Sequence, residues 1–306
     1  PRPESVLVIG FGVGVTTATV AGAPGVERLE VVEIAPEVAA MAPHFAAVNH
    51  DVLADPRVTL ARNDGRNHLL LGGGPYDVIT CDPVHPLLGS APLYSRDFFE
   101  LARRRLAPGG LMCQYLPLHR MPEDAFSTAV ATFQSVFPET WVLFGLGHAM
   151  LVGGERPLEL DWRAWQERLA GHRLRPDLEA SALATPAQVF ALLQLDPGAC
   201  RRLGAPPIST DLHPVLEFLE PEAYAPGLWE TNARRLVEAY RSPVDRVRNL
   251  PPGLAPQLER LVAGKRLLLF SLLERAAGRS DGARRWLDAA LEVAGDDPEV
   301  QLYAAQ

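Results

Sequence analysis

The sequence predicts an α/β fold with a mostly parallel sheet covered by helices on both faces, followed by a C-terminal helical extension. Short apolar, β-branched runs alternate with helical patterns from Val6 to about Gly154, and this alternation is typical of a parallel sheet. From about Gly227 onward the patterns are helical throughout. A chain of 306 residues is long enough for two units, which we place at 1–225 and 226–306.

The spacing of apolar residues and the local composition predict where the individual strands and helices lie. Strands are expected at Val6–Ile9, Leu29–Glu33, Val58–Ala61, Tyr76–Cys81 and Leu111–Leu116, and an antiparallel pair at Trp141–Phe144 and Ala149–Val152. Helices are expected at Glu37–Asn49, Ser95–Leu106, Pro122–Val136, Leu160–Leu169, Pro186–Leu195, Leu228–Tyr240, Ala255–Ala277, Asp281–Val293 and Pro298–Ala305. Thr210 to Phe218 is expected to be a polar loop that runs into a short strand or turn. The last helices have the apolar rhythm of helical-hairpin repeats, so the extension is a helical cap or the start of a repeat array.

A glycine-rich turn directly follows the first strand. Gly10, Gly12 and Gly14 separate that strand from a segment that can open a helix. This arrangement brings backbone N–H groups against a nucleotide-like ligand. Glu33 ends the second strand about twenty residues later, where Rossmann-like folds place the carboxylate that binds ribose hydroxyls. The alternative role for Glu33 is to cap the helix that begins near Pro36.

Two further acids also stand at strand ends. Asp64 follows the third strand and Asp82 the fourth. Ligands in parallel sheets bind at the carboxyl ends of the strands, so we expect these acids and the glycine turn to share one cleft. The alternatives are an ordinary Asp-Gly turn at Asp64 and Gly65, and a loop carboxylate before Pro83 at Asp82.

Composition excludes several classes of function. The net charge of −8 argues against non-specific wrapping of nucleic acid. The three cysteines are scattered, which disfavours a disulfide framework or a zinc site and favours a reducing, cytoplasmic compartment. We expect no metal. We also expect no membrane contact by this chain itself, because no apolar run reaches membrane-spanning length. No signal peptide is recognised, and the start at Pro1, almost on a core strand, suggests a fragment.

An ordered set of motifs resembles the polyamine aminopropyltransferase (spermidine synthase-like) family, in particular the bacterial branch in which such a domain follows a membrane segment. The motifs are Val-Ile-Gly-Phe-Gly-Val-Gly (8–14), Val-Val-Glu-Ile (31–34), Asp-Pro-Arg-Val (55–58), Asn-Asp-Gly-Arg (63–66), Tyr-Asp-Val-Ile (76–79), Asp-Pro-Val-His-Pro (82–86), Leu-Tyr-Ser-Arg-Asp-Phe-Phe (93–99) and Leu-Ala-Pro-Gly-Gly (106–110). The resemblance implies a Rossmann-like class I methyltransferase fold. It leaves open a membrane-anchored part before residue 1, on the cytoplasmic face, and a homodimer.

The resemblance also implies a reaction and residue roles. The donor is decarboxylated S-adenosylmethionine, whose aminopropyl group passes to a small-molecule amine with release of methylthioadenosine. Glu33 would bind the ribose, and Asp64 with Gly65 the adenine, beside the turn of Gly10, Gly12 and Gly14. Asp82 would be the base or amine anchor. His85, which the resemblance does not supply, is a second catalytic candidate because an imidazole can act as a neutral base. Tyr94 and Gln114 are candidates to line the amine site, with core packing the alternative for Tyr94.

Two positions depart from the family pattern. The glycine turn carries Val13 where the family usually has an acid that anchors the aminopropyl ammonium. His85 replaces a second acid that helps to hold the polyamine. Three classes of function therefore stay open: an aminopropyltransferase, a methyltransferase that uses S-adenosylmethionine, and a non-catalytic nucleoside-binding scaffold.

Overall fold

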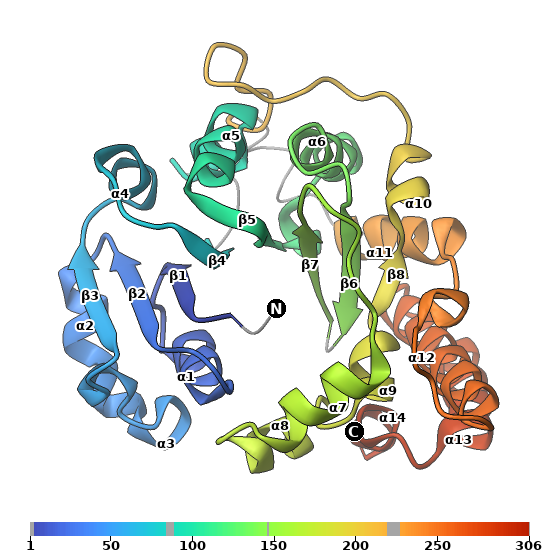
Figure 1. Cartoon of the computed structure of the whole chain (residues 1–306). Helices are drawn as coiled ribbons and strands as arrows, with labels where there is room; N and C mark the ends of the chain where they lie inside the picture. Colours follow the sequence, from blue (N-terminus) through green and yellow to red (C-terminus); the bar gives the residue numbers. More distant parts are fainter. Residues whose placement is uncertain (1–2, 84–88, 146, 219–226, 306) are drawn as a thin grey trace.

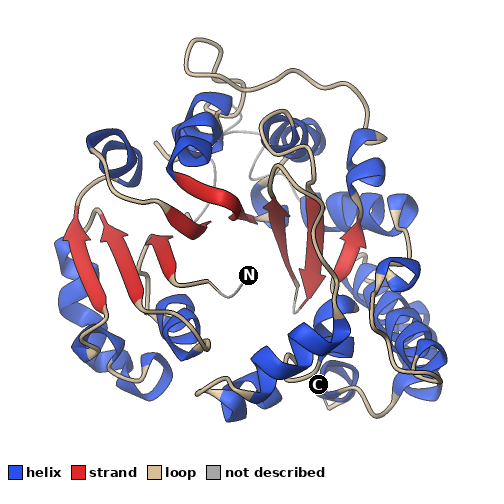
Figure 2. Cartoon of the chain, viewed as in Figure 1, coloured by secondary structure: helices blue, strands red, loops and turns tan. Residues whose placement is uncertain are grey.

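A computed structural model of the chain describes residues 3–83, 89–145, 147–218 and 227–305. It contains an eight-stranded sheet in the order β3-β2-β1-β4-β5-β7-β6-β8 (Figure 2). Strands β1 to β5 pair in parallel, whereas β7, β6 and β8 join antiparallel. The strands are β1 (Ser5–Ile9), β2 (Arg28–Glu33), β3 (Val58–Arg62), β4 (Tyr76–Cys81), β5 (Leu106–Leu116), β6 (Trp141–Gly145), β7 (His148–Gly153) and β8 (Leu193–Leu195). The predicted fold class is confirmed.

Helices cover both faces of this sheet, as Figure 1 shows. Those of the sheet domain are α1 (Val15–Gly22), α2 (Pro36–Met41), α3 (Ala46–Asn49), α4 (Gly65–Leu71), α5 (Arg96–Arg105), α6 (Glu123–Gln134), α7 (Trp162–Ala170), α8 (Arg175–Ala180), α9 (Pro186–Phe190) and α10 (Pro197–Arg201). Those of the extension are α11 (Leu228–Ala239), α12 (Ala255–Ala276), α13 (Ser280–Ala294) and α14 (Pro298–Ala304).

Alternate residues of β1 supply two different cores, as expected for a strand buried on both faces. Leu7 and Ile9 pack with α4, α5 and α6 in the larger core. There the ring of Phe99 meets that of Phe133 edge-on, with centroids 5.0 Å apart. Val6 and Val8 pack with α1 and α2 on the other face. The rigid centre of the sheet thus fixes where the loops after β1 and β4 lie.

Two predicted helices differ from the structure. The segment 37–49 is divided into α2, a 3₁₀ turn and α3, because Pro43 has no N–H for a continuous helix. The predicted helix 186–195 ends at Phe190, and Leu193–Leu195 form β8. Phe144 N donates to Leu192 O at 2.8 Å, so pairing with the sheet edge overrides the local helical pattern. Residues 210–218 form bends and turns without a strand.

The extension packs against the sheet domain through α11. Asn232 Nδ2 donates to Leu118 O at 2.9 Å and to Met121 O at 2.6 Å. Leu236 and Val237 belong to the larger core of the sheet. The proposed boundary at 225/226 lies in the range 219–226, outside the described residues. Among the helices that the structure describes, none is long and apolar enough to cross a membrane.

A buried charge cluster joins α12 to α14. Lys265 Nζ lies 2.9 Å from Asp297 Oδ1 and also contacts Glu299. All three side chains are buried. Asp297 also caps α14, because its Oδ1 accepts the N–H groups of Glu299 and Val300. The cluster therefore fixes how α14 sits on the preceding helical hairpin.

Helices α12 and α13 approach each other closely at Gly264. A Cβ at this position would overlap the Cβ of Ala294. We expect Gly264→Ala to lower the free energy of unfolding by about 1–3 kcal/mol, although alanine is the better helix former. Gly282→Ala is the matched control, since its Cβ would meet only the movable end of Glu274. Thermal unfolding followed by circular dichroism measures both, and equal melting temperatures for the two variants would contradict this packing.

Candidate active site

The carboxyl ends of β1, β2, β3 and β4 bring together the residues that the sequence places in one cleft. Gly10, Glu33, Asp64 and Asp82 each follow or end one of these strands. Asp82 N donates to Ile9 O at 3.1 Å, and Gly10 N donates to Val32 O at 2.8 Å. The strand order reverses between β1 and β4, and such a switch point is where ligands bind in open α/β sheets.

The glycine turn requires glycine at two of its positions for identifiable reasons. Gly10 has φ +91°, and a Cβ there would lie 3.3 Å from Asp82 O. Gly14 has φ +89°, and its Cβ would come within 2.6 Å of the Phe11 ring. Gly14 then caps α1. A side chain at Gly10 would press on the loop after β4, and one at Gly14 would displace Phe11 or Asn49; both positions also have the positive φ that favours glycine.

Glu33 holds the glycine turn in place. Its carboxylate is buried, Oε2 accepts the Phe11 N–H at 2.8 Å, and Oε1 accepts the Ala35 N–H at 2.9 Å. Ala35 immediately precedes α2, but no side-chain hydrogen bond caps this helix, so the alternative role of Glu33 as its cap is not found. Each carboxylate oxygen can accept a second hydrogen bond. Glu33 can therefore order the turn and still receive ribose hydroxyls.

Asp64 and Gly65 begin α4, a helix that the sequence analysis did not anticipate. Asp64 Oδ1 accepts the Asn67 N–H at 2.8 Å and so caps this helix. Gly65 is buried, and a Cβ there would overlap the side chain of Ile9. The structure thus explains Gly65 by the close packing of α4 on β1. Asp64 stands at the edge of the cleft with one oxygen committed to the cap.

An ion pair ties a distant segment to this edge of the sheet. Arg66 Nη1 lies 2.8 Å from Asp211 Oδ1, and Arg66 Nη2 contacts the other carboxylate oxygen. Ser95 Oγ donates to the same carboxylate at 2.9 Å. Ser95 also caps α5. The segment around Asp211 is therefore fastened over the starts of α4 and α5.

The carboxylate of Asp82 is exposed to solvent but only partly hydrated. Its side chain is open to solvent at the end of β4, yet the surrounding protein raises its pKa by removing part of its hydration. The charge of His148 and a hydrogen bond from Thr16 lower the pKa, and the first effect outweighs them. A carboxylate held in this way is suited to proton transfer.

Gln114 and Tyr94 lie beneath Asp82. Gln114 is the register partner of Cys81 on β4. Its side chain is fully buried, and neither Oε1 nor Nε2 makes a hydrogen bond of good geometry in the described part of the chain, although the amide lies close enough to Cys81 and Tyr94 to lower the pKa of both. Such an amide is a candidate to receive a ligand. Tyr94 is also fully buried, and its hydroxyl donates to Tyr115 O at 2.9 Å, which agrees with the packing alternative for this residue.

Four residues of the cleft edge were not selected from the sequence. Thr16 bonds Asp82, and His148 and Tyr115 interact with it electrostatically. Ile34 follows Glu33 and is 70% exposed, so its apolar side chain is available to a flat base. Only the spacing of Ile34 after Glu33 could have been noticed beforehand. The predicted residue His85 lies outside the described residues.

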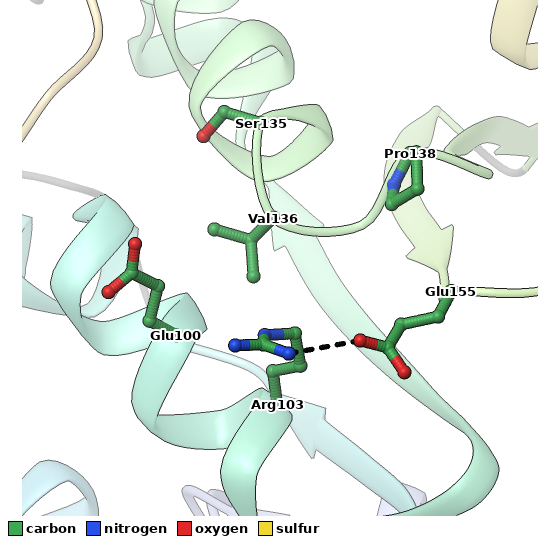
Figure 3. Close-up of a pocket in the computed structure, with 6 residues that line it drawn as sticks. All are labelled: Glu100, Arg103, Ser135, Val136, Pro138 and Glu155. Carbon is green, nitrogen blue, oxygen red and sulfur yellow. Dashed lines mark hydrogen bonds and ion pairs between the residues drawn. The ribbon is translucent and has the colours of Figure 1, made fainter.

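A surface cavity elsewhere on the molecule is not part of this site. It has a volume of about 300 Å³ and lies between α5, the segment that follows α6, and Glu155, two residues after β7 (Figure 3). Arg103 spans the cavity, with its Nη1 3.0 Å from Glu155 Oε1. The cavity lies at the opposite edge of the sheet from Asp82. Within the described ranges, no group of three or more His, Cys, Asp or Glu side chains could hold a metal ion.

Comparison with known proteins places these residues in a family context. Putrescine N-methyltransferase 3 of Nicotiana tabacum is 35% identical over 114 residues, which are 37% of this chain and 30% of that protein. Polyamine aminopropyltransferase 2 of Pseudomonas aeruginosa is 32% identical over 143 residues, 45% of this chain and 41% of that protein. The chain thus spans less than half the length of these curated relatives.

A solved structure and a family model complete the comparison. Spermidine synthase from Thermotoga maritima aligns with 51% of this chain and 55% of that chain, with a TM-score of 0.45 and 22% identity. Residues 1–144 match the model described as the spermine/spermidine synthase domain. The similarity to this family thus covers slightly less than half of the chain, at its N-terminal side.

Proposed function

We propose that this chain transfers an alkyl group from the sulfonium of an adenosyl co-substrate to the nitrogen of a small amine. One observation carries the proposal above the others. Asp82 stands directly beside the glycine turn, because its N–H donates to Ile9 O at the end of β1 and a Cβ on Gly10 would lie 3.3 Å from its carbonyl oxygen. A proton acceptor thus adjoins the place where Rossmann-like sheets bind nucleosides.

The donor side of the site is built from three strand ends. The N–H groups of the glycine turn and the start of α1 face the cosubstrate. Glu33 receives its ribose hydroxyls, and Asp64 with Ile34 contacts the adenine. These roles assign a partner to Ile34, an exposed apolar side chain that otherwise faces water.

The reaction needs alignment and deprotonation rather than leaving-group activation. The amine lone pair attacks the carbon next to the sulfonium, the C–N bond forms, and the C–S bond breaks with its electron pair going to sulfur. Sulfur becomes a neutral thioether. Alkylamines are protonated at neutral pH, so Asp82 binds the ammonium and takes up the proton that the nitrogen loses. In-line positioning supplies much of the rate.

Aminopropyl transfer is the first candidate, with decarboxylated S-adenosylmethionine as donor and methylthioadenosine as product. It is supported by the spermine/spermidine synthase domain at 1–144. Methyl transfer from S-adenosylmethionine is the second candidate. Two observations favour it: the similarity to a putrescine N-methyltransferase, and Val13, which is 42% exposed in the glycine turn and cannot anchor an aminopropyl ammonium.

A side-by-side calorimetric titration tests both candidates. The ligands are methylthioadenosine, S-adenosylmethionine and its decarboxylated form, and an amine is then added to identify the product. Methylthioadenosine as product establishes aminopropyl transfer, and S-adenosylhomocysteine establishes methyl transfer. Binding without either product indicates a nucleoside-binding scaffold, and the absence of all binding overturns the proposal.

Asp82→Asn should remove the proton acceptor while keeping the shape of the side chain. We expect kcat to fall by about 10²–10⁴-fold, with little change in the affinity for methylthioadenosine. Steady-state kinetics and calorimetry measure the two quantities. Asp281→Asn, on the exposed side of α13, is the control. Unchanged turnover in Asp82→Asn would show that the base lies elsewhere.

The raised pKa of Asp82 predicts the pH dependence of turnover. A raised pKa keeps the carboxyl protonated to a higher pH, so kcat should rise with pH above the usual range of aspartate. Thr16→Val removes a hydrogen bond that lowers the pKa of Asp82. The rise of kcat should therefore move to a still higher pH in this variant. Thr19→Val is the matched control, since Thr19 Oγ1 bonds only Val15 O within α1. A shift of this rise to lower pH in Thr16→Val would contradict this assignment.

Glu33→Gln should lower the affinity for every adenosyl ligand by a similar factor. The amide keeps one acceptor but turns an N–H donor toward a backbone N–H that Glu33 now accepts. The loss of hydrogen bonds to a charged group should raise the dissociation constant of methylthioadenosine by about 10- to 100-fold. Glu37→Gln, exposed on α2, should leave it unchanged. Equal affinities for both variants would place the nucleoside site elsewhere.

A further inference from the structure

The β6–β7 hairpin brings a histidine to Asp82 from a part of the chain far from the glycine turn. His148 is the first residue of β7 and pairs across the hairpin with Gly145. Its side chain is exposed, and Nδ1 lies 3.1 Å from Tyr115 Oη. The two rings are 5.8 Å apart between centroids. Because β7 runs antiparallel to β5, its first residue stands at the same edge of the sheet as Asp82.

His148, Tyr115 and Asp82 interact with one another. The charge of His148 lowers the pKa of Asp82, and the charge of Asp82, together with burial, raises the pKa of Tyr115. The titratable groups whose pKa responds to Asp82 are Cys81, Tyr94 and Tyr115. None of these three is a carboxylate, and an imidazole is neutral or cationic but never anionic.

Two exposed side chains, one on β7 and one in the glycine turn, are apolar. Met150 lies two residues after His148 on the same face of β7 and opposite Tyr115 on β5. It is 37% exposed. Val13 stands exposed in the glycine turn. Among the residues that the structure describes, His148 and Tyr115 thus adjoin one carboxylate, that of Asp82, and Met150 and Val13 add exposed alkyl side chains.

We propose that His148, paired with Tyr115, forms the acceptor side of the site and selects amines with a single cationic nitrogen and an apolar body. This inference rests on the proposed function, whose acceptor it specifies. The lone ammonium binds Asp82, and the body lies along Val13 and Met150. A polyamine would bring further ammonium groups toward an imidazole that cannot attract them, at a cost in desolvation.

The helical extension positions this histidine. Trp229 in α11 donates from Nε1 to Gly147 O at 3.3 Å, directly before His148. Its ring also packs near Phe144 of β6, with centroids 6.3 Å apart. Trp229 is thus a positioning residue, and the extension completes the acceptor side without touching the donor.

The test compares hexylamine, with one nitrogen, and spermidine, with three. In wild type we expect kcat/KM to favour hexylamine. His148→Glu adds a carboxylate and should raise the spermidine-to-hexylamine ratio of kcat/KM by about tenfold or more. His44→Glu, exposed on the far 3₁₀ turn, controls for net charge and should not change the ratio. A wild-type preference for spermidine, or an unchanged ratio in His148→Glu, would overturn the inference.

Trp229→Phe tests the positioning role by a split between kinetic constants. We expect a higher KM for hexylamine, with kcat and the affinity for methylthioadenosine little changed. Trp286→Phe, which alters the ring stacked on Phe270 in the extension, should change none of these. A general loss of stability would lower donor affinity and kcat as well, and that outcome would reduce Trp229 to a packing residue.

Failure of this inference can be told apart from failure of the proposed function. If no amine gives methylthioadenosine or S-adenosylhomocysteine with wild type, the proposed transfer fails. The acceptor inference is then decided by titrating both amines into the protein saturated with methylthioadenosine. Hexylamine binding that exceeds spermidine binding, and a reversal in His148→Glu, would support it. The opposite order, or no amine binding, would overturn it.

Discussion

The close approach of the glycine turn to the loop after β4 is the contact on which the site depends. Asp82 N–H bonds the last carbonyl of β1, and Gly10 lies so near that a Cβ would press on Asp82 O. Parallel pairing of β1 with both β2 and β4 creates this contact. It places the proposed nucleoside-binding turn beside the proposed proton acceptor, and the proposed reaction needs both at this distance.

The parts of the fold and site that rest on local pattern were predictable. Buried β-branched runs identify β1, β2 and β4, and their order along the chain places Glu33 and Asp82 at one edge. Glu33 illustrates how far this goes. Its position was predicted, whereas the hydrogen bond from Phe11 N that orders the glycine turn joins residues distant in sequence and leaves no local signal.

The residues that escaped prediction are those placed by tertiary contacts. Leu193–Leu195 were expected to be helical because a short apolar run fits both periods, and pairing with β6 decides for a strand. His148 occupied a turn between two strands with nothing to single it out. Its meaning depends on the antiparallel return of β7 beside β5 and on Trp229, about eighty residues away in sequence.

The buried cluster of Lys265, Asp297 and Glu299 has a consequence for assembly of the extension. A buried ion cluster adds little net stability, because desolvation offsets most of the attraction. Misplacing one member, however, strands an unpaired charge in the interior. A slip of α14 along α12 by a single residue would do so. The cluster therefore fixes the register of α14 against α12. It favours the correct arrangement over similar ones more than it adds to the overall stability.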